Sequence, residues 1–136
     1  MAFIETLKNK IRTKFKTDIE TALTVPVLYD NDPRDPRPDD SLWIRLAILL
    51  GTKEQVSLGD KKRFRQPGII VASIFTQIGK GTKDSDSLAD SITTAFQAQT
   101  VNGVVYMTPY QVPVGRQGQD WQANINCPFY SDFVET

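Results

Sequence analysis

Five aspartates lie close together between residues 29 and 41, and acidic oxygens at such short spacing are the ligands that a hard cation such as calcium prefers. They are Asp30, Asp32, Asp35, Asp39 and Asp40. The EF-hand pattern needs a central glycine, and this segment has none, while prolines interrupt its acids. Arg34 and Arg37 would also neutralise the site. The pattern therefore favours a stiff, exposed connection, with metal binding as the weaker alternative.

Two glycine-containing motifs resemble ligand-binding sequences but lack their context. The first, GKGT at residues 79–82, would need a glycine five positions before its Gly-Lys pair to form a phosphate-binding loop, and Ile74 stands there. The second, GRQG at 115–118, matches the GxxG pattern that clamps RNA between two helices, but here it falls between predicted strands. A strand-to-helix turn and a hairpin turn are the favoured interpretations.

Groups for the common catalytic systems are scarce. The chain has no histidine, which removes the commonest general base, most zinc sites and the Ser-His and Cys-His nucleophiles. The single cysteine, Cys127, excludes an internal disulfide, and its place among alternating apolar residues indicates a small buried hydrophobe. Asp84 and Asp86 lie in a predicted loop without a partner acid or base. We therefore expect no enzyme, no metal and no cofactor.

Length and composition are typical of one soluble domain over residues 1–136. The chain is 40% apolar and 24% charged, with a formal net charge of zero. A bulk electrostatic preference for nucleic acid or membrane is therefore not predicted. No apolar run approaches the roughly 20 residues that span a bilayer. The first residues mix apolar and basic side chains, so we expect no signal peptide.

The first half of the chain predicts one helix and several strands. Residues 2–23 show apolar side chains at helical spacing: Ile4, Leu7, Ile11, Phe15, Ile19 and Leu23. A short strand is expected at 25–29, and a strand buried on both faces for much of its length at 42–50, with a short continuation at 55–58. The basic segment 59–68 has turn residues at both ends and predicts a protruding loop or hairpin tip.

The second half predicts strands around another helix. A strand at 69–78 is followed by a helix at 85–99, with Ser87 and Asp90 in a capping pattern. A strand at 103–108, a loop at 109–118 and a final strand from Trp121 complete the chain. In that final strand apolar residues alternate with amides. The predicted fold is α+β: an antiparallel or mixed β-sheet packed against two α-helices on the same face.

The order and spacing of these segments resemble a known family. The resemblance rests mainly on a Pro-Gly-led strand that runs through a glycine turn into a Leu-Ala-Asp helix (RQPGIIVASIFTQIGKGTKDSDSLAD), on the strand GVVYMTP, and on the closing strand WQANINCPFYSDF. "VPVLYDN" and "LWIRLAILLG" precede them in the expected order. Together these segments are similar to the tail terminator proteins of long-tailed bacteriophages, over nearly the full chain.

The resemblance implies a structural virion protein of the viral tail. Such subunits form a homo-oligomeric ring, usually a hexamer, that caps the tail tube, stops polymerisation of the tail tube protein and offers a surface for head–tail joining to a head-completion or neck protein. DNA passes through the lumen without sequence-specific binding, and no membrane is involved. The resemblance also implies assembly in the host cytoplasm and a place at the head-proximal end of the tail. Head–tail connectors and tail tube proteins share parts of this fold and remain the alternative.

Ring subunits meet through heterologous interfaces, which are enriched in arginine and aromatic residues. The exposure patterns therefore predict contacts with partner subunits at Arg34, Arg37, Lys61, Arg63, Phe64, Arg65, Tyr110 and Arg116. In this interpretation the aspartate-rich segment is a presented assembly loop that leads into the strand at Trp43. A second alternative is a small nucleic-acid-binding module that uses the first helix and the basic residues 61–65.

Overall fold

The computed structural model describes residues 3–21, 27–29, 42–56, 62–77, 83–101, 103–117 and 120–135. Its helical elements are α1 (Phe3–Phe15), the π-helix η1 (Lys16–Thr21) and α2 (Lys83–Phe96). Its strands are β1 (Val27–Leu28), β2 (Leu42–Leu50), β3 (Glu54–Gln55), β4 (Lys62–Gln77), β5 (Thr100–Val101), β6 (Val104–Tyr106), β7 (Tyr110–Gln117) and β8 (Asp120–Glu135). The expected α+β class is confirmed for the described residues.

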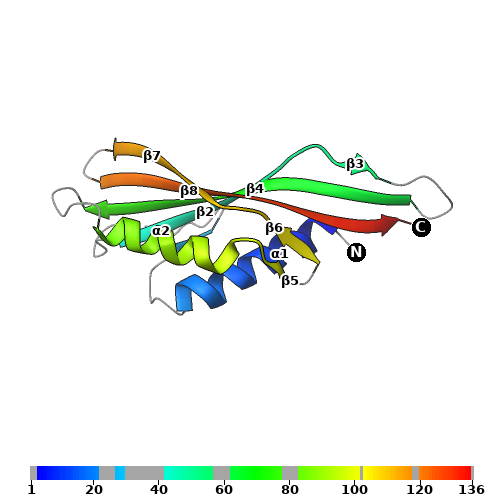
Figure 1. Cartoon of the computed structure of the whole chain (residues 1–136), viewed down its shortest axis with the longest axis horizontal. Coiled ribbons are helices and arrows are strands. Elements are labelled where there is room, and N and C mark those ends of the chain that lie inside the picture. Colours follow the sequence, from blue (N-terminus) through cyan, green and yellow to red (C-terminus); the bar gives the residue numbers. More distant parts are fainter. Residues whose placement is uncertain are drawn as a thin grey trace.

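The strands form one mixed sheet that is more extensive than the sequence patterns predict. Its order is β1-β2-β4-β8-β6-β5, with β3 paired to β4 and β7 paired to β8 (Figure 1). Only the β1–β2 pair is parallel among the described pairings. The centre of the sheet is the antiparallel pair β4–β8, whose register is unbroken from Lys62↔Glu135 to Gln77↔Asp120.

Two predicted loops belong to this sheet. The loop or tip predicted at 59–68 is wrong from Lys62 onward, because β4 begins there. The loop predicted at 109–118 is also wrong, because β7 occupies Tyr110–Gln117. In both segments proline and glycine lower the local strand propensity, but β8 lies alongside and continues the hydrogen-bond ladder. Tertiary pairing therefore overrides the local turn signal.

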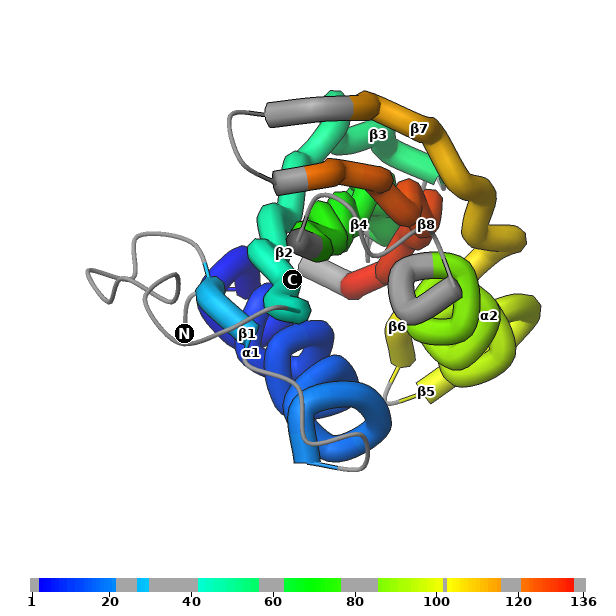
Figure 2. The backbone as a smooth tube through the Cα atoms, turned by 90° about the vertical axis from the view of Figure 1, so that its left-hand side faces the viewer, coloured from blue at the N-terminus to red at the C-terminus, as the bar shows by residue number. Residues whose placement is uncertain are grey.

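Both helices lie on one face of the sheet, as predicted. Figure 2 shows α1 and α2 on the same side of β2, β4 and β8, with β7 away from them. The face that they cover carries every second residue of the central strands, including Ile44, Leu46 and Ile48 of β2 and Ile70 and Ile74 of β4. This period of two is what a strand needs to present one apolar face.

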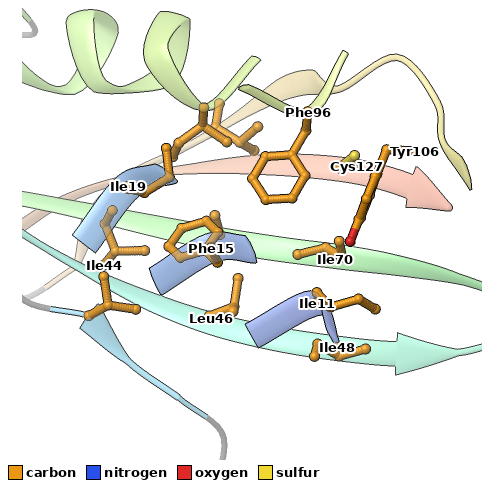
Figure 3. Packing of buried hydrophobic residues seen from close by; sticks show 14 of the residues in the cluster. Ile11, Phe15, Ile19, Ile44, Leu46, Ile48, Ile70, Phe96, Tyr106 and Cys127 are labelled. Atoms are coloured by element: carbon orange, nitrogen blue, oxygen red, sulfur yellow. The ribbon is translucent and has the colours of Figure 1, made fainter. Parts of the chain in front are cut away.

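The core forms where the buried stripe of α1 meets the covered face of the sheet. Leu7, Ile11, Phe15 and Ile19 are all buried, at a constant spacing of four residues, which keeps them on one side of the helix. Phe15 packs close to Phe96 of α2, with 5.9 Å between the ring centroids (Figure 3). Each such fully buried apolar side chain contributes roughly 1.5–3 kcal/mol to stability.

The helices differ from their predicted form in three respects. Ile4 was expected on the buried stripe but is 47% exposed. The helix continues past Phe15 as the π-helix η1, which no sequence pattern indicated. The capping pattern at Ser87 and Asp90 is wrong, because α2 already begins at Lys83 and both residues lie inside it.

The expected strand at 42–50 is confirmed over its full length, but it is buried on both faces only near its start, since Arg45 and Leu49 are exposed.

Gly68 provides a direct test of the pairing between the central strands. A Cβ atom at this position would lie 2.6 Å from the carbonyl oxygen of Leu49 and 2.6 Å from the ring of Phe129. We expect Gly68→Ala to lower the free energy of unfolding by about 1–3 kcal/mol, the usual cost of overpacking. The measurement is urea denaturation followed by circular dichroism.

Gly51→Ala is the matched control, because its added Cβ would approach nothing closer than 3.5 Å. It should change the free energy of unfolding much less than Gly68→Ala. Equal stability of the two variants would contradict the close approach of β2, β4 and β8 at Gly68.

Candidate assembly surface

The sheet continues beyond the helices as a narrow extension, which we call the ribbon end. It consists of β3, residues 62–67 of β4 and residues 130–135 of β8 (Figure 1). Phe64 of β4 and Phe133 of β8 are register partners, and their rings stack at 5.6 Å between centroids. Phe3 of α1 stacks on the same Phe133 ring at 4.0 Å. This aromatic stack fixes the ribbon end to the first turn of α1.

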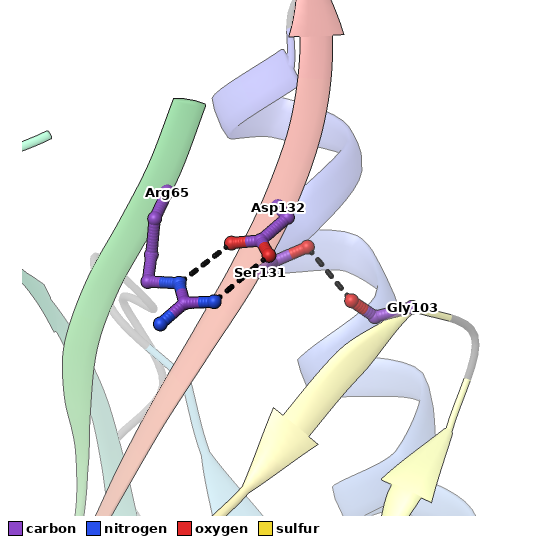
Figure 4. Close-up of polar contacts among 4 residues, drawn as sticks. All are labelled: Arg65, Gly103, Ser131 and Asp132. Atoms are coloured by element: carbon purple, nitrogen blue, oxygen red, sulfur yellow. Dashed lines mark hydrogen bonds and ion pairs between the residues drawn. The ribbon is translucent and has the colours of Figure 1, made fainter. Parts of the chain in front are cut away.

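The opposite face of the ribbon end carries a charged and aromatic cluster. Arg65 donates two hydrogen bonds to Asp132, from Nε to Oδ1 at 2.8 Å and from Nη2 to Oδ2 at 3.1 Å (Figure 4). The Arg65 guanidinium also lies 4.2 Å from the ring centroid of Tyr130. A bidentate pair stacked on an aromatic ring holds the guanidinium in one orientation.

The ion pair shifts both titrating groups toward their charged forms. The hydrogen bond from Arg65 holds the pKa of Asp132 below its ordinary value, and the charge of Arg63 acts in the same direction. The hydrogen bond to Asp132 likewise raises the pKa of Arg65. Close by, Ser131 Oγ donates a hydrogen bond to the carbonyl oxygen of Gly103 at 2.9 Å, which ties the β5–β6 turn to β8.

The sheet face that the helices leave uncovered, which we call the outer face, is the second candidate surface. At one end Trp43 and Phe75 stack at 4.1 Å between ring centroids, and Arg45 lies over both rings, at 5.5 and 5.7 Å. Further along, Leu49 is 58% exposed. Trp43 and Phe75 are themselves buried, so the accessible part of this face consists mainly of Arg45, Leu49, the amides of β8 and residues of β7.

Strand β7 adds exposed apolar groups to the outer face. Tyr110 is 48% exposed and Val112 37%, and they are the register partners of Asn126 and Asn124 of β8. The Oδ1 atom of Asn126 is buried without a hydrogen-bond partner among the described residues. The outer face therefore carries exposed apolar groups of β7 beside the amides of β8.

The predicted contact residues differ in their surroundings. Arg34, Arg37 and Lys61 lie outside the described residues. Arg63 and Tyr110 are exposed, Arg65 is bound to Asp132, and Arg116 is known only by its backbone in β7, opposite Trp121. Phe64 is half-buried and packs within its own chain. The structure therefore brings Arg63, Phe64 and Arg65 together at the ribbon end and places Tyr110 on the outer face. Their contact role stays a prediction.

Several residues of these surfaces were missed by the sequence patterns. Asp132, Arg45 and Asn126 gain their surroundings from strand register, which a single sequence does not reveal. Lys53 lies 5.3 Å from the Phe133 ring centroid and 5.8 Å from that of Phe64, although it is far from both in sequence. For Asp132 the sequence did contain a signal. The alternation of apolar and amide residues in β8 continues past Tyr130 and would have placed Asp132 on the same face as the amides.

The described part of the chain has neither a membrane-spanning helix nor a metal-binding cluster. No helix there is long and apolar enough to cross a membrane. No group of three or more His, Cys, Asp or Glu residues is placed to hold a metal ion in these same ranges. The aspartates of the predicted loop lie outside these ranges, so metal binding there stays a prediction.

Comparison with known proteins gives one family and one fold. The family described as "Phage tail terminator protein" matches residues 10–129. No curated protein matches the sequence. Among solved structures 11 chains match, and one of them has a TM-score of 0.66 at 16% identity, with 95% of this chain and 98% of that chain covered. At that identity the likeness shows a shared fold along almost the whole chain.

The ion pair of the ribbon end predicts a pH-dependent stability. The pKa of Asp132 is lowered in the folded state, so its carboxylate contributes fully to the stability of the fold at pH values above its unfolded pKa of about 3.9. This contribution to stability is lost as the pH falls through the folded pKa. We expect Asp132→Asn to cause a small decrease in Tm at pH 7, a decrease that shrinks below about pH 4. The measurement is thermal unfolding as a function of pH.

Asp86→Asn is the control, because it removes an exposed carboxylate of α2, away from the ribbon end. A difference between Asp132→Asn and the unmodified protein that stays constant down to pH 2 would contradict the ion pair.

Proposed function

The chain belongs to the phage tail terminator family and is a structural component of the virion tail, and on that premise we propose that it forms a closed ring that caps the tail tube. The ring, a hexamer by resemblance, terminates polymerisation of the tube protein at the head-proximal end of the tail and offers its other side to a head-completion or neck protein. Its role is assembly, without catalysis. The family match over residues 10–129 carries this proposal.

The surfaces of the chain support an assembly role. The outer face exposes Leu49, Tyr110 and Val112, and neither α1 nor α2 covers it (Figure 2). The ribbon end adds the Arg65–Tyr130 stack, of the residue types that dominate interface energies. A ring requires such surfaces at two different places on one chain.

Tube capping is the decisive experiment. Purified protein added to polymerising tube protein should give tubes that are shorter on average and that end in a ring in negative-stain images. Light scattering should give a discrete oligomer in the absence of tube protein. A strictly monomeric protein that leaves the tube length unchanged would overturn the proposal, and binding to tube walls instead of ends would favour a tube-like subunit.

The predicted assembly loop has its own test. Arg34→Ala together with Arg37→Ala should leave the circular dichroism spectrum and Tm unchanged and should raise the protein concentration for half-assembly about tenfold, equal to ~1.4 kcal/mol. The physical reason is that arginines anchor interfaces through several donors at once. Lys10→Ala together with Lys16→Ala is the control, because it removes the same charge from exposed positions of α1 and η1. If the double variant assembles like the unmodified protein, the predicted assembly loop makes no contact with a partner and only connects its neighbouring segments.

A further inference from the structure

Arg45 is the only charged residue of β2, and two aromatic rings support its guanidinium on the outer face. Trp43 and Phe75 stack at 4.1 Å between ring centroids, and the guanidinium carbon of Arg45 lies 5.5 Å and 5.7 Å from these centroids. Both rings are buried, whereas Arg45 itself is exposed. The rings therefore restrict the orientation of the guanidinium, which stays in contact with solvent.

The N–H donors of this guanidinium are open. In the described part of the chain Arg45 makes its two ring contacts but no hydrogen bond or ion pair. Arg65 differs, because Asp132 accepts two of its hydrogen bonds. A guanidinium has five N–H donors in a planar fork, and a carboxylate is the acceptor that matches this fork best. Arg45 therefore offers a pre-oriented site for a carboxylate.

Helix α2 carries the complementary charge. Residues 84–96 contain three aspartates and no base. Asp86 and Asp90 are both exposed and lie four residues apart, which puts their carboxylates on the same side of the helix. No ion pair engages either of them within the described residues. We call these two residues the acidic stripe, which does not include Asp18, because Lys14 already compensates that charge.

Arg45 and the acidic stripe cannot meet within one chain. Arg45 lies on the outer face of the sheet, whereas α2 covers the other face. Figure 1 places β2 and α2 in the same half of the long axis, the half that is remote from the ribbon end. Figure 2, which looks along that axis, shows β2 and α2 on opposite sides of β4. Two copies that stand side by side with parallel long axes therefore bring β2 of one next to α2 of the other.

We propose that Arg45 of one copy binds the acidic stripe of the neighbouring copy. This contact rests on the proposed ring and names one of its interfaces. The guanidinium donates to the carboxylates of Asp86 and Asp90 together, since the two positions are about one helical turn apart and five N–H groups serve several acceptors at once. The aromatic support lowers the entropy cost of the contact, because the arginine is already oriented.

A second copy is the occupant that the charge distribution favours. A closed ring needs two different, complementary patches on the same chain, so that every subunit donates one and accepts the other. Strand β2, with one base and no acid, and residues 84–96, with three acids and no base, meet this requirement. The net charge of the chain is zero, so no bulk repulsion between copies opposes the contact. A nucleic acid would also suit an arginine, but it would leave the acidic stripe without a role.

A charge exchange tests the contact directly. Arg45→Glu should raise the concentration for half-assembly at least tenfold, and so should the lysine-stripe variant, Asp86→Lys with Asp90→Lys, because each places like charges opposite one another. All three substitutions in one chain should return assembly to within about threefold of the unmodified protein, because the contact is restored in reverse. The readouts are light scattering and native mass spectrometry, with circular dichroism and Tm to verify folding.

Mixing the two defective proteins shows whether the contact joins different copies. In a ring where Arg45→Glu copies alternate with lysine-stripe copies, every contact again unites opposite charges. An equimolar mixture should therefore assemble at a concentration within about threefold of the unmodified protein, with equal numbers of the two variants in each ring. If the triple variant assembles but the mixture does not, the charges act within one chain and the proposal is overturned.

The matched control is Arg45→Glu combined with Glu5→Lys and Glu54→Lys. It has the same net charge as the triple variant, but it reverses exposed carboxylates of α1 and β3 in place of the acidic stripe. It should assemble no better than Arg45→Glu alone. Rescue by this control would reduce the effect to net charge and overturn the contact.

The outcomes separate this contact from the proposed ring. Normal assembly of the folded lysine-stripe variant, next to an unmodified protein that forms rings, would overturn the contact and leave the ring intact; this variant leaves the aromatic support of Arg45 untouched. An Arg45→Glu protein that forms normal rings but loses binding to DNA would assign Arg45 to nucleic acid and would also overturn the contact. An unmodified protein that is monomeric at every concentration would overturn both proposals.

Discussion

The antiparallel pairing of β4 with β8 is the constraint on which the rest of the structure depends. It joins the full length of both strands, from Lys62↔Glu135 to Gln77↔Asp120, and every other strand except β1 and β5 pairs directly with one of the two. Because side chains alternate with a period of two, this register decides for each residue whether it faces the helices or the outer face. A shift by one residue would expose Ile70, Ile74 and Ile125 and would bury the amides of β8.

The same register separates two kinds of chemistry. On the covered face Phe15, Phe96 and Tyr106 close a core that also contains Cys127, and burial raises the pKa of that thiol to about 12. On the outer face Arg45 lies over the buried Trp43–Phe75 stack, and the exposed Leu49 lies on the same face as the amides of β8. A protein whose function is assembly needs both: a core that holds a narrow sheet rigid, and a face that is free to meet partners.

Sequence patterns predicted the parts of this structure that local periodicity controls. The strand Leu42–Leu50, the buried stripe of α1, the alternation of β8 and the burial of Cys127 follow from residue spacing alone. The first half of β4 and all of β7 did not, because Pro67, Gly68 and Pro113 signal turns and only the presence of β8 makes these segments strands. The Arg65–Asp132 pair arises from a contact between distant segments, which spacing cannot reveal. The π-helix has no pattern that we can identify.

A closed ring has to solve two physical problems with one sequence: it must bind its neighbour firmly, and it must bind in one register. Apolar and aromatic groups such as Leu49 and Tyr110 supply affinity, but they tolerate sliding, because the hydrophobic effect has no direction. Segregated charges supply the register, since a displaced neighbour brings like charges together. In the proposed ring, Arg45 of β2 and the acidic residues of α2 would supply such charges.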